Sequence, residues 1–268
     1  MIKHNINLFN QSFLVELRKL LAYRWEFWTG FLGQTFIFVG ISYFLWKSIF
    51  LSNGVTEMHG IALTDFILYY LTAHLIFKTM LGPNIGFISH DIYYGTLNKF
   101  IVYPVSFQFI KIASYLAHSF FYYAQLIILI SLHKLLFGNS VDLISFSLGS
   151  LTLITASYCY FLISASIELI AFWAENIWSL AILLRSFIHI GGGYLIPLSF
   201  YPEKISHFLY YTPFPYLIYE PIQIFRGQTS LEHFFLINAI LLGWIFIAYI
   251  VFRLVWYRGN RQFTGVGI

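Results

Sequence analysis

Six stretches of this sequence are long and apolar enough to cross a membrane, and they constrain the fold more than any other feature. They cover residues 27–50, 61–81, 107–132, 143–171, 177–196 and 234–256. A helix needs about 20 mostly apolar residues to cross the roughly 30 Å hydrocarbon core of a bilayer. Because a backbone in lipid must satisfy its own hydrogen bonds, we expect six transmembrane helices in one all-α domain over residues 1–268.

The composition agrees with a membrane protein and excludes several other classes. Hydrophobic residues make up 59% of the chain and charged residues 10%, a balance that a soluble domain of this length could not bury. The net charge of +4 comes from cations scattered around the apolar stretches, so it predicts topology and not nucleic-acid binding. The only cysteine, Cys159, excludes a disulfide framework within the chain. Residues 1–22 lack the cleavage site of a secretory signal peptide, so we expect an internal helix to direct insertion.

The lysines and arginines other than Lys78 and Arg185 predict the side of the membrane that each loop occupies. Cations favour the cytoplasmic side, and with an even number of spans both termini share one side. One side collects Lys3, Arg18, Lys19, Arg24, Lys99, Lys111, Arg253, Arg258 and Arg261, whereas the other collects Lys47, Lys134, Lys204 and Arg226. We therefore expect a multi-pass protein of the cell (inner) membrane with both termini in the cytoplasm.

The segment before the first span, residues 1–26, has the pattern of an amphipathic helix. Apolar residues recur near the helical period, and charged residues fall on other faces. The apolar set is Phe9, Phe13, Leu17, Leu20 and Leu21. Such a helix is typical of the membrane interface, where we expect it to lie on the cytoplasmic side. The alternative is an ordinary cytoplasmic extension.

The connection between the second and third spans is predicted to hold a short cytoplasmic helix between chain breakers. Gly82-Pro83 precedes it and Pro104 follows it. Ser89 is placed to cap the N-terminus of this helix, and Asp91 favours its positive end. Pro104 is expected to restart the chain into the third span.

Prolines concentrate between the fifth and sixth spans. Five of the seven lie there: Pro197, Pro202, Pro213, Pro215 and Pro221. The same segment is rich in large apolar side chains that would be costly to leave in water. We therefore expect a re-entrant external hairpin of short helices, packed on protein in the outer leaflet. It follows Gly191-Gly192-Gly193, a run that disfavours helix by about 1 kcal/mol per glycine and is either a helix end or a hinge.

Ionisable side chains in or beside the spans are candidates for function, because burying each one costs at least about 2.5 kcal/mol. Lys78 lies near the end of the second span, where it can snorkel to headgroups. Glu168, Glu175 and Asn176 surround the turn between the fourth and fifth spans. Arg185 falls about 12 Å into the fifth span and needs a partner or a polar cavity. Glu168 on the neighbouring helix is one candidate partner, in a structural ion pair or in a translocation path.

Motifs of common catalytic sites do not occur in the sequence. It contains no G-x-x-x-x-G-K-[ST] phosphate loop, no H-E-x-x-H and no G-x-S-x-G. Its nine histidines form no pair at metal-ligand spacing. We expect neither enzymatic activity nor a metal or cofactor in this chain.

Several short segments in a fixed order carry a family resemblance. They are Leu21-Ala22-Tyr23-Arg24, Asp91-Ile92-Tyr93-Tyr94-Gly95-Thr96-Leu97 running to Tyr103-Pro104, Phe172-Trp173-Ala174-Glu175-Asn176, Gly192-Gly193-Tyr194-Leu195-Ile196-Pro197 running to Phe200-Tyr201-Pro202-Glu203, Tyr211-Thr212-Pro213-Phe214-Pro215, and Tyr219-Glu220-Pro221 ending at Gly227. Over nearly the whole chain, their order and spacing resemble permease subunits of ABC-type exporters, in the group with daunorubicin-resistance-like and uncharacterised transport-system permeases.

The resemblance implies partners and a division of labour. ATP and Mg²⁺ would bind a separate ATPase subunit, present in two copies, and a second permease, identical or related, would complete a membrane part that contacts lipid and no nucleic acid. The short cytoplasmic helix would be a coupling helix that docks on the ATPase through Asp91, Tyr93, Tyr94, Gly95, Leu97 and Asn98. The sequence departs from the family's pattern at Ser89-His90, where a more acidic start is expected.

Another class of function stays open on the residues alone. A secondary transporter driven by an ion gradient, or a channel, would also span the membrane. It predicts broken helices at corresponding positions of two halves, and only the fifth span carries such a break. The substrate is not specified, because the many phenylalanines and tyrosines indicate only an amphipathic one.

Overall fold

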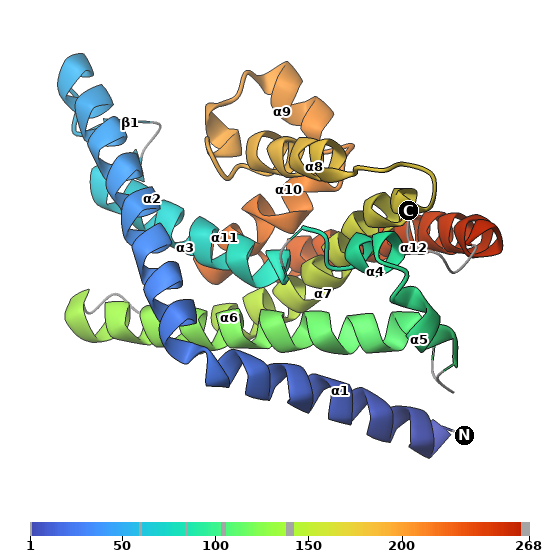
Figure 1. Cartoon of the computed structure of the whole chain (residues 1–268). Helices are drawn as coiled ribbons and strands as arrows, with labels where there is room; N and C mark the ends of the chain where they lie inside the picture. The colour runs from blue at the N-terminus through green and yellow to red at the C-terminus, as the bar shows by residue number, and fades with distance from the viewer. Residues whose placement is uncertain (1, 59–60, 84, 103–105, 138–141, 264–268) are drawn as a thin grey trace.

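The computed structural model describes residues 2–58, 61–83, 85–102, 106–137 and 142–263. This part of the chain is a helical bundle with one small β-hairpin, so the expected all-α class is confirmed (Figure 1). Its long helices are α1 (Ile2–Ala22), α2 (Arg24–Asn53), α3 (Leu63–Leu81), α6 (Phe107–Phe137), α7 (Leu143–Glu168), α8 (Trp178–Gly191) and α12 (Leu231–Gln262). The predicted restart at Pro104 lies outside the described residues, and α6 begins at Phe107.

Within the described residues, four stretches combine the length and the apolar composition that a membrane crossing requires. They are Trp28–Asn53, Phe107–Leu129, Leu143–Phe172 and Leu231–Gln262. Helix α8 is apolar but has only 14 residues. Helix α3 has 19 residues and lies inside the bundle against α2, α6 and α7, with Phe66, Ile76 and Met80 completely buried. Neighbouring helices therefore enclose much of α3.

Helix α1 packs along α6 (Figure 1). The ring of Phe13 meets that of Phe120 edge-on at 6.1 Å between centroids, and Glu16 lies 3.9 Å from His118. Helix α6 therefore covers part of the predicted apolar stripe, whereas Leu21 stays exposed. The membrane-surface position of α1 stays a prediction, because packing on α6 neither requires nor excludes it.

Short elements join the long helices. Between α2 and α3, β1 (Glu57–Met58) pairs antiparallel with β2 (Ile61–Ala62), a hairpin that we did not predict. Between α3 and α6 lie α4 (Ser89–Tyr93) and α5 (Leu97–Val102), and η1 (Leu169–Phe172) follows α7. Between α8 and α12 lie η2 (Leu198–Phe200), α9 (Glu203–Leu209), α10 (Phe214–Leu217) and α11 (Tyr219–Phe225). We call the end of the bundle that carries α4, α5 and η1 the α4 end.

The predicted glycine and proline signals coincide with the ends of these helices. Helix α8 ends at Gly191, and Gly193 has a φ of +79° that favours glycine. The prolines stand at helix starts, where a missing N–H costs nothing. Pro197, Pro202 and Pro213 directly precede η2, α9 and α10, and Pro215 and Pro221 lie in the first turns of α10 and α11.

The segment between α8 and α12 is fastened to the bundle by side chains of α3. The Tyr69 hydroxyl donates to the carbonyl of Gly193 at 2.5 Å, and the Tyr70 hydroxyl donates to that of Leu195 at 2.7 Å. These bonds satisfy carbonyls just past the C-terminus of α8 and fix where the chain turns.

A buried acid, Glu220, joins α11 to its neighbours. It is 3% exposed, accepts a hydrogen bond from the Tyr210 hydroxyl at 2.8 Å, and lies 3.5 Å from His233 at the start of α12. Burial raises the pKa of the Glu220 carboxyl, and the Tyr210 hydrogen bond and His233 offset part of that rise.

Candidate functional site

The loop between α3 and α6 forms two helices where we predicted one. Helix α4 ends at Tyr93, the chain turns through Tyr94 and Gly95, and α5 begins at Leu97. Gly95 has a φ of +66°, a left-handed conformation that an L side chain adopts with strain. The single predicted helix was therefore wrong, because Gly95 reverses the backbone after barely more than one turn.

The N-terminus of α4 is capped by an acid from another helix. Oε2 of Glu168, the last residue of α7, accepts hydrogen bonds from the backbone N–H groups of Ile88 at 2.5 Å and Ser89 at 3.1 Å. Glu168 is 5% exposed, so its charge depends on these donors and on the positive end of α4. The predicted Ser89 cap was wrong, because its side chain makes no capping bond and its N–H is itself a donor.

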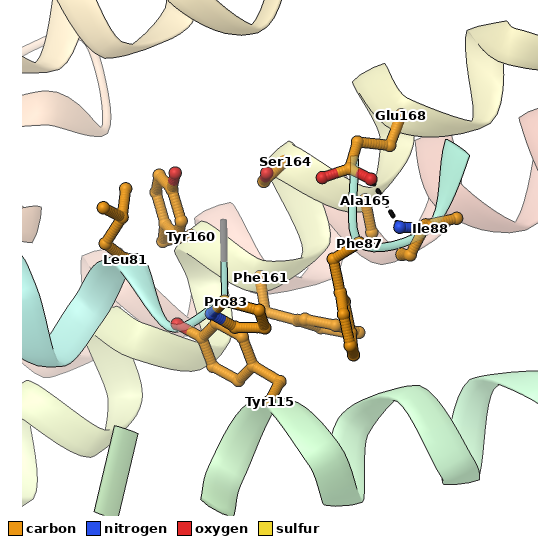
Figure 2. Close-up of a pocket in the computed structure, with 10 residues that line it drawn as sticks. All are labelled: Leu81, Pro83, Phe87, Ile88, Tyr115, Tyr160, Phe161, Ser164, Ala165 and Glu168. Carbon is orange, nitrogen blue, oxygen red and sulfur yellow. Dashed lines mark hydrogen bonds between the residues drawn. The ribbon is translucent and has the colours of Figure 1, made fainter. Parts of the chain in front are cut away.

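Figure 2 shows this contact from the side of a small cavity. A dashed line joins the Glu168 carboxylate to the Ile88 nitrogen, and Tyr160 and Ser164 of α7 line the same cavity. The cavity measures about 20 Å³, which is room for about one water molecule.

Asp91 faces the interior of the loop and not the surface. It is 7% exposed, pairs with Lys111 of α6 at 2.6 Å, accepts from the Thr96 hydroxyl at 2.5 Å, and lies 3.9 Å from Lys99. Lys111 is buried too, donates to the Phe87 carbonyl at 2.5 Å, and sits 4.1 Å from the centroid of the Phe87 ring. The ion pair therefore ties α4 to α6.

A further anchor holds the C-terminus of α3. The Tyr115 hydroxyl of α6 bonds to the carbonyl of Met80, and it also reaches the carbonyl of Ser157 on α7 at 2.9 Å. Gly82 has a φ of +61°, and a Cβ at this position would collide with the Tyr115 ring. The chain leaving α3 is therefore locked against α6 and α7 before it reaches α4.

The surface of the loop is formed by the residues between α4 and α5. Tyr94 is 69% exposed, and its ring lies 4.2 Å from that of His90, which is exposed as well. Asn98 is also exposed, whereas Leu97 is completely buried. Tyr93 is half-buried, and burial raises the pKa of its hydroxyl, as does the nearby Glu168 carboxylate. Of the predicted coupling residues, Tyr94 and Asn98 can therefore meet a partner.

The predicted pairing of Glu168 with Arg185 is not what the structure shows. Among the described residues no ion pair joins them, and Arg185 bonds to the Tyr160 hydroxyl. Glu168 stands at the very end of α7, whereas Arg185 lies seven residues beyond the start of α8 at Trp178. Tyr160, two turns back in α7, is at the matching depth, which explains the partner that Arg185 finds.

Glu175 and Asn176 remain at the turn between α7 and α8. Both are exposed, and the Asn176 side chain accepts from the Trp178 N–H at 2.8 Å, which helps to start α8. Neither lies with Arg185 in one cluster, so the four predicted residues do not form a single site.

Sequence reasoning missed the residues that anchor the loop, chiefly Lys111 and Tyr115. We interpreted Lys111 only as a topology signal. A lysine and a tyrosine four residues apart on the first turns of an apolar helix lie on one face, and that spacing was the available clue.

Comparison with known proteins gives the family. A search of the curated proteins found no match. The family model described as ABC-2 family transporter protein matches residues 36–267, which include the α4–α5 loop, the α7–α8 turn and the segment between α8 and α12. This match covers most of the chain and agrees with its long apolar helices: the chain belongs to the ABC-2 family of membrane transport proteins and is a permease.

Proposed function

We propose that this permease is the membrane subunit of an ATP-driven exporter, and that it forms half of the translocation path. A separate ATPase subunit, in two copies, binds ATP and Mg²⁺ and hydrolyses the nucleotide. A second permease, identical or related, supplies the other half. The family, the expected absence of a phosphate loop and the anchored α4–α5 loop support this assignment.

The proposal carries a topology of six spans in the cell membrane. Helices α2, α3, α6, α7, α8 and α12 are these spans, and the α4 end faces the cytoplasm together with both termini. The short elements between α8 and α12 are the re-entrant external hairpin. The cations Lys99, Arg258 and Arg261 at the α4 end support this orientation.

The observation that carries the coupling role is the double anchoring of α4. Glu168 ties it to α7 and the pair of Asp91 with Lys111 ties it to α6, while Tyr94 projects from its far side. A loop held this way moves as a rigid body with the two helices, so a push on Tyr94 is transmitted to the spans. Asp91, Gly95 and Leu97 shape the loop, and Tyr94 and Asn98 present its contact surface.

The test is to purify tagged permease from native membranes and to measure how much ATPase comes with it. Wild type is compared with Tyr94→Arg and with the control variant Tyr211→Arg. The two tyrosines are matched controls, since they are 69% and 71% exposed and Tyr211 lies in the segment between α8 and α12. We expect wild type and Tyr211→Arg to retain an ATPase and Tyr94→Arg to lose it. Equal capture by all three variants contradicts the docking role of Tyr94. If no ATPase purifies with the wild-type permease, the exporter assignment fails, and transport driven by an ion gradient becomes the alternative.

A further inference from the structure

Two positive side chains face each other between α3 and α8 without an acid. Lys78 lies three residues before the end of α3, and Arg185 lies in the middle of α8. They are close enough for their charges to repel. In the part of the chain that the structure describes, neither makes an ion pair with a carboxylate.

Both cations are held by neutral groups. Lys78 donates a hydrogen bond to the side-chain oxygen of Gln34 on α2, and Arg185 bonds to the Tyr160 hydroxyl on α7. Such partners orient a cation without neutralising it. The four helices α2, α3, α7 and α8 thus hold two cations that no carboxylate among the described residues pairs with.

Two histidines beside these cations each keep a nitrogen free. His74 is 3% exposed, bonds through Nδ1 to the Tyr194 hydroxyl at 3.0 Å, and its buried Nε2 has no partner among the described residues. The ring of His189 stacks on that of Tyr194 at 4.6 Å between centroids, and the Nε2 of His189 is also buried and unpaired in the described chain. Lys78 lies near His74, and Arg185 lies near His189. Unpaired buried nitrogens are uncommon and indicate a missing partner.

A lipid-facing position would be very unfavourable for such a cluster. Charged groups inside spans almost always face a polar cavity or pair with a counter-charge, and they mark substrate pathways. Arginine and lysine together suit an anionic oxygen group, because guanidinium offers a planar fork of donors and ammonium a compact charge. Two exposed apolar side chains stand on the same helices two residues further on: Phe36 follows Gln34 on α2, and Phe187 follows Arg185 on α8.

We propose that Lys78 and Arg185, with Gln34 and the two histidines, bind the anionic headgroup of an amphipathic substrate, a phosphate or a carboxylate, while its apolar tail lies against the aromatic faces of α2 and α8. This rests on the proposed function, which gives the permease half of a translocation path, and it assigns the face between α2 and α8 to that path. Lys78 lies near the end of α3 that leads to α4, so the headgroup is reached from the cytoplasmic leaflet.

The test uses full-length permease in phosphatidylcholine nanodiscs and three fluorescent probes with the same acyl chain. The probes are a phosphatidic acid, a fatty acid and a phosphatidylcholine, and energy transfer from protein tryptophan reports binding. We expect at least one anionic probe to bind about tenfold or more tightly than the zwitterionic probe. The phosphatidic acid and fatty acid arms distinguish a phosphate from a carboxylate headgroup.

The variants Lys78→Gln, Arg185→Gln and their double are expected to remove this preference, whereas Lys204→Gln, an exposed cation on α9, should keep it. Arg185→Lys retains the charge and should keep part of the preference. Equal binding of anionic and zwitterionic probes by wild type overturns the site, as does an unchanged preference in the double variant.

ATPase capture by the double variant separates this site from the proposed function. Capture together with a lost anion preference supports both. Capture together with an unchanged preference overturns the site alone. If neither wild type nor the double variant captures an ATPase, but wild type prefers anions and the double variant does not, the site is supported and the exporter assignment fails.

Discussion

Replacing Glu168 with alanine should release α4 while leaving the rest of the bundle folded. The substitution removes the acceptor of two backbone N–H groups, those of Ile88 and Ser89, at a position where the side chain is 5% exposed. Leaving a buried donor unpaired costs about 1–3 kcal/mol. The cavity beside Glu168 can admit water and recover part of that loss, so we expect α4 to be destabilised by about 3 kcal/mol.

Hydrogen–deuterium exchange read by mass spectrometry on the purified permease measures this directly. A loss of about 3 kcal/mol in local stability should speed exchange of the amides in residues 86–93 by about 100-fold, because these amides open through the local motion that the carboxylate opposes. Glu168→Gln keeps an acceptor oxygen but loses the charge, so its effect should be about tenfold. Exchange within α12 should stay as in wild type in both variants.

Glu175→Ala is the matched control, since Glu175 is exposed at the turn that follows η1 and caps no described helix. Its exchange pattern should equal that of wild type. Two results would refute the reasoning. The first is exchange in residues 86–93 of Glu168→Ala within about threefold of wild type. The second is an equal rise along the whole chain, which would make Glu168 a general stabiliser and not a clamp on α4.

Three more predictions test packing, charge and pH, all by thermal unfolding in detergent. Gly82 and Gly54 both have a φ near +60°, which strains an alanine at either position, but only at Gly82 would the new methyl group meet an aromatic ring. Gly82→Ala should therefore lower the midpoint of thermal unfolding more than Gly54→Ala does. Equal shifts of the midpoint would contradict this. Lys111→Met leaves the buried Asp91 carboxylate without the Lys111 charge and should lower the free energy of unfolding by about 3–5 kcal/mol. The double variant Lys111→Met/Asp91→Asn should recover part of this loss. If the losses of the two single variants simply add in the double variant, the two residues do not interact. The pKa of Glu220 is raised above its ordinary 4.5 by burial, so the folded chain keeps a proton that the unfolded chain has lost, and stability should fall as pH rises from 4.5 through the raised pKa. Glu220→Gln should remove this slope, and a wild-type advantage that grows with pH would show the opposite linkage.

The helices could be predicted because their signals are local. Long apolar stretches predicted helices α2, α3, α6, α7, α8 and α12 to within about six residues at each end. The glycine run was predicted to be a helix end or a hinge, and α8 ends at Gly191. The prolines of the segment between α8 and α12, such as Pro202 and Pro213, stand at the starts of short helices. A proline is tolerated there because the first N–H groups of a helix have no hydrogen-bond partner within it. These features depend on neighbours in the sequence and not on the packing of distant segments.

The contacts of the site could not be predicted in the same way, because they join distant residues. Glu168 and Ile88 are 80 positions apart, and only the packing of η1 on α4 brings them together. Arg185 was assigned to Glu168 by counting helical turns from a tight connection, but the connection includes η1 and a further turn, so the depths did not match. Periodicity correctly marked the stripe on α1 that includes Phe13, yet it could not tell whether lipid or α6 would cover it.

The two proposed sites are joined by a short and well-anchored piece of chain. Ten positions separate Lys78 from Ile88, and between them Gly82 packs on Tyr115 while Glu168 holds Ile88. A displacement of α4 by the ATPase would therefore move the end of α3, and with it the separation of Lys78 from Arg185. An anion stabilises the arrangement that keeps these two cations close, so it favours one position of α4. Coupling of this kind is reciprocal. If an anionic lipid between Lys78 and Arg185 changes the affinity of the permease for the ATPase by some factor, then the ATPase must change the affinity of the permease for the lipid by the same factor.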